Sequence, residues 1–382
     1  MHFHVVSLPH TITSKEYCAC AYTQKVLNFC KMMTSLGHTV YHYGGEGSEV
    51  AALEHITTVS SLERAQFFGS NDWKKDFFAV EWDSRLPYWQ LANSRAVSEI
   101  TQRLSKKDFI CLIGGNCQKP IADAFPAHMS VEFGIGYTGV FAPYKVFESY
   151  SHMHWVYGYL HDDTGKFFDT VIPNYFDEDD FPIGTEKEDY YLFVGRTIDR
   201  KGYQIAIDTT EAMGAKLVMA GQGASGMTFP DHVSHVGTVD VKTRGTLMSR
   251  AKALFAPTTY IEPFGGVAVE AMMCGTPVIA TDFGAFTETV INGFTGYRIH
   301  TLGEAIDAAQ KLSLFYKTDF ENVAQYARKR YSLDTVKWMY QDYFKRLLTL
   351  WGEGWYQKEY DPTARDMVLN SRTLLVSPSF IA

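Results

Sequence analysis

The sequence contains few cysteines, no long apolar run and no excess of positive charge. Six cysteines in 382 residues are too few for a disulfide framework, and the Cys18-Ala-Cys20 spacing does not suit a zinc knuckle, so we expect reduced thiols. The first ten residues lack a basic flank and hold only a short apolar stretch. We therefore expect neither a signal peptide nor a membrane span, and a cytoplasmic location.

Charge and size narrow the class of protein further. The chain has 35 Lys and Arg residues against 43 Asp and Glu residues, a net charge of −8. Such a balance gives no overall attraction for phosphate backbones, which argues against a constitutive nucleic-acid binder or a protein held on anionic lipid. A hydrophobic fraction of 46% indicates a globular chain, and 382 residues exceed the usual size of one core, so two domains are expected.

Common motifs of nucleotide hydrolases and of metal-binding proteins are absent or badly placed. No G-x-x-x-x-G-K-[ST] string occurs, so the phosphate loop of nucleotide hydrolases is excluded. The D-x-D string Asp177-Glu-Asp179 falls in an acidic stretch, where we expect a solvated turn instead of a metal site. His2 and His4 alternate on a predicted strand without further ligands, so no metal site is predicted.

The hydrophobic pattern indicates an α/β fold. Short apolar runs alternate with helical periodicity, which is typical of βα units in parallel sheets. Strands are predicted at residues 3–7, 38–43, 108–113, 129–133, 144–148 and 168–172, and then at 190–194, 216–220, 235–237, 253–256 and 277–281. The clearest helix covers Tyr22 to Leu36 and ends at Gly37. Residues 173–189 combine prolines with an acidic run, so we place the linker between two domains there.

The stretch from Ala253 to Ala280 carries the most specific chemistry. It is predicted to run from a strand through a loop into a helix, and Pro263, Gly265 and Gly266 keep the chain irregular until the helix begins. The first N–H groups of a helix have no intrahelical partner. The start of this helix is therefore an anion site that suits a diphosphate.

Charged residues flank this predicted anion site. Glu270 lies one turn into the helix and leans back toward its start, where a carboxylate suits the paired hydroxyls of a ribose. The alternative is that Glu270 only favours the helix dipole. Glu262, on the loop, would face the hydroxyls of a sugar. Arg196, Arg200 and Lys201 follow another predicted strand and supply the cations that a leaving diphosphate requires, although a solvated basic turn has the same composition.

With these motifs the sequence closely resembles the retaining GT-B glycosyltransferases of the large family-four group. The similarity runs from about residue 171 to residue 297, with the family's order and spacing. The matching motifs are E-x-F-G-x-x-x-x-E at Glu262 to Glu270, G-R-x-x-x-x-K-G at Gly195 to Gly202, I-P-N at Ile172 to Asn174 and G-T-P-V at Gly275 to Val278.

The resemblance implies a role for each matching position. Arg196 and Lys201 would bind the donor diphosphate and support its departure. The backbone of Gly265, Gly266 and Val267 would lend N–H groups to the same diphosphate.

In this family the second glutamate of the motif, here Glu270, holds the ribose, and the first, here Glu262, contacts the donor sugar as a catalytic group. The reaction would retain the configuration of the anomeric carbon, use a UDP- or GDP-sugar and require no metal.

The resemblance also implies two Rossmann-like domains facing a cleft. Residues 1–176 would bind the acceptor and residues 177–344 the nucleotide sugar. Residues 345–382 would return to the first domain, with a helix from Arg346 to Trp355 crossing back. The acceptor is not specified by the sequence: a glycan, a lipid-linked glycan, a small molecule and a modified nucleic acid all stay open.

The first half of the chain matches the family poorly. Leu8-Pro9-His10 stands where members commonly have two glycines. Many members have a histidine at the end of the strand predicted at 129–133, where Glu132 is the nearest polar residue; it is a candidate contact for the sugar or acceptor. His152 and His154 lie beside aromatic residues and are interpreted as packing residues.

Three other functions stay open at this stage. A glycosyltransferase acting on a hydroxylated DNA base would need a basic groove, for which the basic residues are only scattered. A sugar-nucleotide epimerase with the same fold would release a new sugar nucleotide without an acceptor. A non-catalytic sugar-nucleotide binding module is the third, and the intact charged residues of the motifs count against it.

Overall fold

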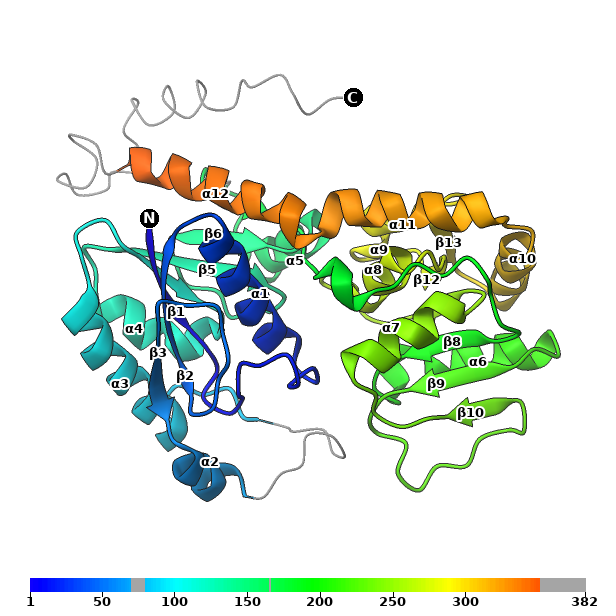
Figure 1. Ribbon diagram of the computed structural model, residues 1–382, viewed down its shortest axis with the longest axis horizontal. Helices are drawn as coiled ribbons and strands as arrows, with labels where there is room; N and C mark the ends of the chain where they lie inside the picture. Colours follow the sequence, from blue (N-terminus) through cyan, green and yellow to red (C-terminus); the bar gives the residue numbers. More distant parts are fainter. Residues whose placement is uncertain (70–79, 165, 351–382) are drawn as a thin grey trace.

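The computed structural model describes residues 1–69, 80–164 and 166–350, and in them two parallel β-sheets form two α/β domains that lie side by side (Figure 1). The first sheet has the strand order β3-β2-β1-β4-β5-β6-β7 and the second the order β10-β9-β8-β11-β12-β13. The expected α/β class with two parallel-sheet domains is confirmed.

The strands of the first sheet are β1 (His2–Val6), β2 (Thr39–Gly45), β3 (Glu54–Val59), β4 (Phe109–Leu112), β5 (Met129–Ile135), β6 (Tyr144–Phe147) and β7 (Thr170–Val171). The strands of the second sheet are β8 (Tyr191–Val194), β9 (Leu217–Ala220), β10 (Val233–His235), β11 (Leu254–Ala256), β12 (Val278–Thr281) and β13 (Gly296–Ile299). Within each sheet, every pair of neighbouring strands is parallel. Strands β3 and β13 were not predicted, and β7 is shorter than expected.

The helices of the first domain are α1 (Ala21–Ser35), α2 (Ser61–Phe68), α3 (Pro87–Arg103), α4 (Lys119–Ala124) and α5 (Tyr150–Tyr159). Those of the second domain are α6 (Tyr203–Ala212), α7 (Val241–Arg250), α8 (Gly266–Met273), α9 (Phe286–Thr289), α10 (Leu302–Leu312) and α11 (Lys317–Tyr331). Helix α12 (Leu333–Thr349) follows α11 along the same side of the molecule and lies over the first domain (Figure 1).

The core of the first domain explains why α12 returns to it. Val26 and Phe29 recur at helical spacing on α1 and pack against Phe3 of β1. Phe344 of α12 joins the same cluster, with its ring centroid 4.7 Å from that of Phe3. Burial of such aromatic side chains stabilises the contact by roughly 2 kcal/mol each, so the C-terminal helix is an integral part of the first domain.

The chain passes between the domains at two adjacent places. Phe176 accepts a backbone hydrogen bond from Leu333 and donates one to Tyr331. The return to the first domain therefore begins at Ser332, earlier than the expected 344/345 boundary and the expected helix from Arg346. The part of that expected helix beyond residue 350 lies outside the described residues, as does the tail.

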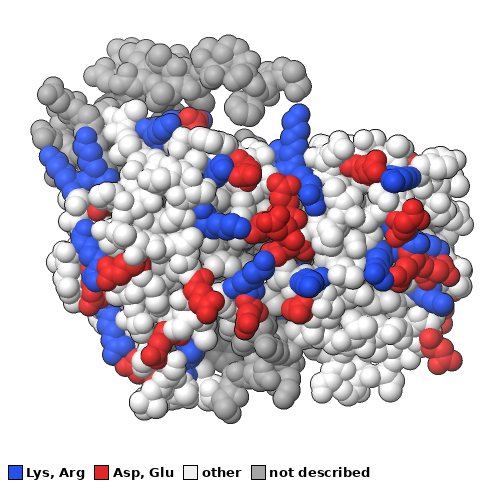
Figure 2. Space-filling view, in the orientation of Figure 1, with Lys and Arg blue, Asp and Glu red and all other residues white. Residues whose placement is uncertain are grey.

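The acidic stretch after β7 forms ion pairs with the first domain. Asp177 pairs with Lys31 of α1, and Asp180 pairs with Lys15 at 2.5 Å. The D-x-D string thus lies at a short turn that Asp177 caps by accepting the N–H of Asp179. On the face in Figure 2, acidic and basic side chains lie interspersed along the middle of the molecule.

No helix in the described part of the chain is both long and apolar enough to cross a membrane.

Candidate functional site

A cavity of about 830 Å³ lies between the two domains and is lined by residues of both. Seven of the eight predicted site residues line it: Arg196, Lys201, Glu262, Gly265, Gly266, Val267 and Glu270. Glu132 does not line the cavity.

The start of α8 opens into this cavity. The helix is almost entirely apolar, and its buried residues fix it between the second sheet and α11. Gly265 caps it with φ 76°, a left-handed conformation, and a Cβ there would stand 2.4 Å from a ring carbon of Phe286. Only glycine meets both conditions. The free N–H groups of the first turn are consequently held toward the cavity by a rigid, buried helix.

Glu262 is held by a lysine and a tyrosine. Its Oε2 lies 2.9 Å from Lys201 Nζ and accepts a hydrogen bond of 2.5 Å from the Tyr260 hydroxyl. Gly202, with φ 72°, follows Lys201, and a Cβ there would stand 1.9 Å from the carbonyl oxygen of Pro257. The close approach of these two loops brings Lys201 and Glu262 together at the cavity.

Arg196 and Arg200 add positive charge to the same wall. Arg196 follows β8, and burial lowers the pKa of its guanidinium, which nevertheless stays charged at neutral pH. The guanidinium carbon of Arg200 lies 4.0 Å from the ring centroid of Tyr260. With Lys201, three cations line one cavity, as the sequence predicts.

Glu270 is paired with an arginine that the sequence prediction did not include. Arg244 of α7 donates from Nη2 to Glu270 Oε1 at 2.8 Å. Burial raises the pKa of the Glu270 carboxyl, and the positive charge of Arg244 opposes that rise. Glu270 lines the cavity one turn below the start of α8, so its carboxylate is available to a ligand there.

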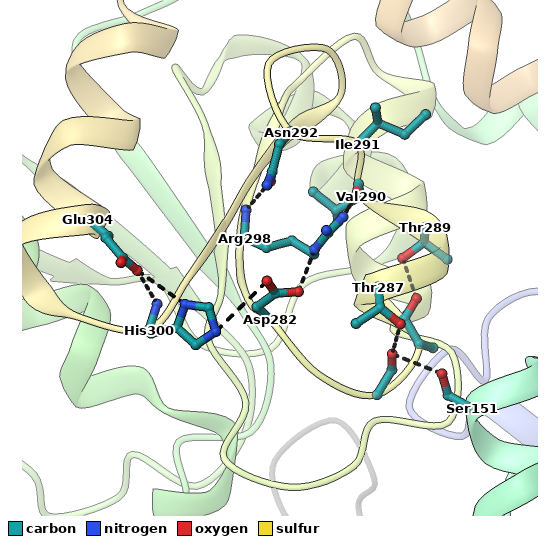
Figure 3. A network of polar contacts seen from close by, with 12 residues as sticks. Ser151, Asp282, Thr287, Thr289, Val290, Ile291, Asn292, Arg298, His300 and Glu304 are labelled. Carbon is teal, nitrogen blue, oxygen red and sulfur yellow. Dashed lines mark hydrogen bonds and ion pairs between the residues drawn. The ribbon is translucent and has the colours of Figure 1, made fainter.

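The loop after β12 contacts the backbone of Glu262, and a network of polar contacts holds this loop in place (Figure 3). Ala285 donates its backbone N–H to the carbonyl oxygen of Glu262. Asp282 is fixed by Arg298, whose Nε donates to it at 2.6 Å. The same arginine donates to the carbonyl oxygen of Val290 at 2.5 Å. The Ser151 hydroxyl of α5 donates to the carbonyl oxygen of this loop at residue 284 (3.1 Å), so the first domain also touches it.

The wall from the first domain carries a buried ion pair. Lys25 Nζ of α1 lies 2.5 Å from Glu148 Oε1, and only 4% of each side chain is exposed. Lys25 also donates to the carbonyl oxygen of Gly134 at 2.9 Å. Burial raises the pKa of the Glu148 carboxyl, Lys25 lowers it, and the negative charge of Glu262 across the cavity raises it again. Two carboxylates, one from each domain, therefore face the same space.

Comparison with known proteins finds a family that is similar to the second domain. Residues 176–330 match the family described as Glycosyl transferases group 1. Among curated proteins, the phosphatidyl-myo-inositol mannosyltransferase of Mycobacterium leprae is 30% identical over 142 residues, which cover 34% of this chain and 37% of that protein. The matches span between 28% and 37% of the length of these curated relatives.

Solved structures extend the likeness to both domains. The sucrose-phosphate synthase of Thermosynechococcus elongatus matches with a TM-score of 0.71 at 15% identity, over 91% of this chain and 99% of that one. Anabaena HepE, crystallised with UDP-glucose, matches with a TM-score of 0.60 at 16% identity, over 92% of this chain and 100% of that one. The overall fold is the GT-B fold of glycosyltransferases.

Glu132 and His152 are both buried and hydrogen-bonded within the first domain. Glu132 is fully buried and accepts hydrogen bonds from the backbone of Phe141 and Ala142 and from the Tyr137 hydroxyl. Burial raises the pKa of its carboxyl to about 7. His152 is also fully buried, and its Nε2 lies 3.2 Å from the carbonyl oxygen of Tyr137. Glu132 therefore does not line the cavity between the domains, whereas Glu148 does.

Sequence reasoning missed Lys25, Glu148 and Arg244, although two of them leave a signal. Lys25 falls on the apolar face of α1 between Tyr22 and Phe29, where a cation requires an acidic partner. Arg244 likewise shares the buried face of α7. Glu148 ends a strand and has no comparable periodic signal.

Proposed function

We propose that the chain transfers a sugar from a nucleoside-diphosphate sugar to an acceptor, with retention of anomeric configuration. The observation that carries this proposal is the convergence of Lys201, Arg196, Glu262 and Glu270 on one cavity at the start of α8. Cations and open N–H groups match the diphosphate of such a donor, and the two carboxylates match the hydroxyls of its ribose and of its sugar.

Each group of residues would bind a different part of the donor. The N–H groups of Gly266 and Val267 at the start of α8 would receive the diphosphate, with Arg196 and Lys201 neutralising its charge. Glu270 would accept hydrogen bonds from the ribose hydroxyls. Glu262, held by Lys201, would face the transferred sugar.

The same groups would lower the barrier to transfer. When the bond between the anomeric carbon and the diphosphate oxygen breaks, negative charge grows on the departing diphosphate and positive charge on the sugar ring. Lys201 and Arg196 stabilise the first charge, and the loss of one such donor costs roughly 3 kcal/mol of transition-state stabilisation. The Glu262 carboxylate stabilises the second. In a single displacement with retention, the acceptor hydroxyl bonds to the anomeric carbon and its proton passes to the departing diphosphate.

A UDP-sugar is the first donor to test, with a GDP-sugar second, because a structure with the same fold binds UDP-glucose. We propose that no metal ion is needed, since Arg196 and Lys201 provide the positive charge that a diphosphate requires. The acceptor would lie against the first-domain wall near Tyr22 and Glu148, which line the cavity. We favour a glycan, lipid-linked glycan or small molecule over a DNA base, because basic side chains on the face in Figure 2 are interspersed with acidic ones.

Ligand-dependent thermal unfolding tests the donor. A panel of UDP-, GDP- and ADP-sugars should contain one that raises the unfolding temperature, since a ligand that binds only the folded state stabilises it by mass action. The chosen donor is then incubated in EDTA with candidate acceptors, and the product's anomeric configuration is read by NMR. A product of inverted configuration contradicts retention. A new sugar nucleotide formed without acceptor indicates an epimerase, and binding without any release of nucleotide indicates a binding module.

A further inference from the structure

Arg244 lies opposite Glu270 because α7 and α8 pack side by side. Helix α7 is fixed at its start by Asp240, which accepts the N–H of Thr243 at 2.7 Å. It is fixed again at Gly245, where a Cβ would stand 2.5 Å from the carbonyl oxygen of Asp180. The backbone that carries Arg244 is therefore held on two sides, and its side chain has a defined origin at the wall of the cavity.

The Arg244–Glu270 pair lies at the edge of the cavity, and not all of its polar atoms have a hydrogen-bond partner among the described residues. The side chains of Arg244 and Glu270 are 15% and 12% exposed, and both line the cavity. The guanidinium binds Glu270 through Nη2 and Oε1. Within the described residues, Arg244 Nε is buried and has no hydrogen-bond partner. The second carboxylate oxygen, Oε2, has no hydrogen bond from any described residue.

Stability alone does not account for this arrangement. A buried ion pair gains little over well-packed apolar residues, because desolvation of the two charges offsets their attraction. A pair that leaves Oε2 of the carboxylate open toward a cavity is suited to another purpose. The guanidinium contact at Oε1 restricts where the carboxylate can lie, and a carboxylate held in this way presents Oε2 to the hydroxyls of a ligand.

We propose that Arg244 is a positioning residue that orients the Glu270 carboxylate for the 2′- and 3′-hydroxyls of the donor's ribose, and that it thereby sets selectivity for ribose over 2′-deoxyribose. This inference rests on the proposed function, because it takes a nucleoside diphosphate as the ligand. It goes further in naming the residue that makes Glu270 selective.

Calorimetric titration with paired nucleotides tests the proposal. UDP, GDP and ADP are each compared with their 2′-deoxy counterparts, and the nucleotide that binds best is carried forward. A hydrogen bond to a charged group contributes about 1.5–3 kcal/mol, so the wild-type chain should bind the ribose form about tenfold more tightly or better. In Arg244→Met the preference should fall to about threefold or less, because an untethered carboxylate samples several orientations. Arg244→Lys keeps the charge without the planar fork and should lie between them.

The ratio of two affinities within one protein separates positioning from folding. A variant that is partly unfolded binds both nucleotides less, and its preference does not change. Lys242→Met removes the same charge from an exposed position on α7 and serves as the matched control; its preference should equal that of the wild type. If the wild type binds a nucleotide and Arg244→Met keeps the same ribose preference, this inference is overturned and the proposed function is not. Absence of binding of all three nucleoside diphosphates by the wild type overturns the proposed function, and this inference with it.

Discussion

Replacing Lys201 with methionine should sharply weaken donor binding while leaving the fold in place. The substitution keeps a side chain of similar length and removes one positive charge from the cavity. A charged hydrogen bond to a diphosphate is worth about 1.5–3 kcal/mol, so the dissociation constant for UDP should rise about tenfold to hundredfold.

The same loss of UDP affinity should appear as a smaller UDP-dependent stabilisation in thermal or denaturant unfolding. With UDP at about a thousand times the wild-type dissociation constant, binding stabilises the folded wild type by about 4 kcal/mol. A hundredfold weaker site at the same UDP concentration gives about 1.4 kcal/mol. Without ligand the change should be small, because the Lys201 and Glu262 side chains are 23% and 12% exposed and such a partly solvated pair contributes about 1 kcal/mol or less.

Lys311→Met is the matched control. Lys311 pairs with Asp307 at 2.5 Å and lies 5.5 Å from the ring centroid of Tyr297, so it has the same kinds of partner as Lys201 but does not line the cavity. Its UDP-dependent stabilisation should match that of the wild type. Full stabilisation by UDP in Lys201→Met would refute the assignment of this lysine to the diphosphate.

Three further predictions concern acidic residues around the site. Burial raises the pKa of Glu132 from 4.5 to about 7. The stabilisation that comes from the protonated Glu132 carboxyl is therefore complete below pH 4.5 and is lost as pH rises to about 7. The wild type should lose roughly 3 kcal/mol of unfolding free energy over that interval; urea denaturation of Glu132→Gln should show no such loss, and equal pH dependence in both proteins would contradict this. Glu148→Gln should cost about 3 kcal/mol because Lys25 is left buried without its counter-ion, and adding Lys25→Met should restore part of that loss; strictly additive losses would argue against the pair. Glu288 accepts backbone N–H groups of Tyr150 (3.0 Å) and Ser151 (2.7 Å) across the domain boundary; Glu288→Ala should loosen the domains and raise the radius of gyration in X-ray scattering, and an unchanged radius would show that this contact does not hold them together.

Much of the fold follows from local pattern. The buried strands 109–112 and 191–194 are continuous apolar runs, which is typical of strands covered on both faces. Strand β3 was missed because Glu54–Val59 mixes polar and apolar residues, and β13 because it is short and begins with glycine. Pairing with a neighbouring strand, and not local propensity, makes these segments strands.

The lining of the candidate site was likewise predictable only in part from local sequence. Gly265, Gly266 and Glu270 belong to one continuous motif, so spacing alone located them. Glu148 and Arg244 reach the cavity through the packing of separate elements, which a sequence read without its fold does not provide. Glu132 was predicted from its place at a strand end, but its side chain is occupied by backbone N–H groups of the following loop.

The most direct test of the central claim is a crystal structure of the chain with UDP or UDP-glucose bound. Our account predicts the diphosphate at the start of α8 within hydrogen-bond distance of Lys201 and Arg196, and the ribose hydroxyls on Glu270. A nucleotide bound elsewhere, or a diphosphate in this cavity that touches neither cation, would contradict it.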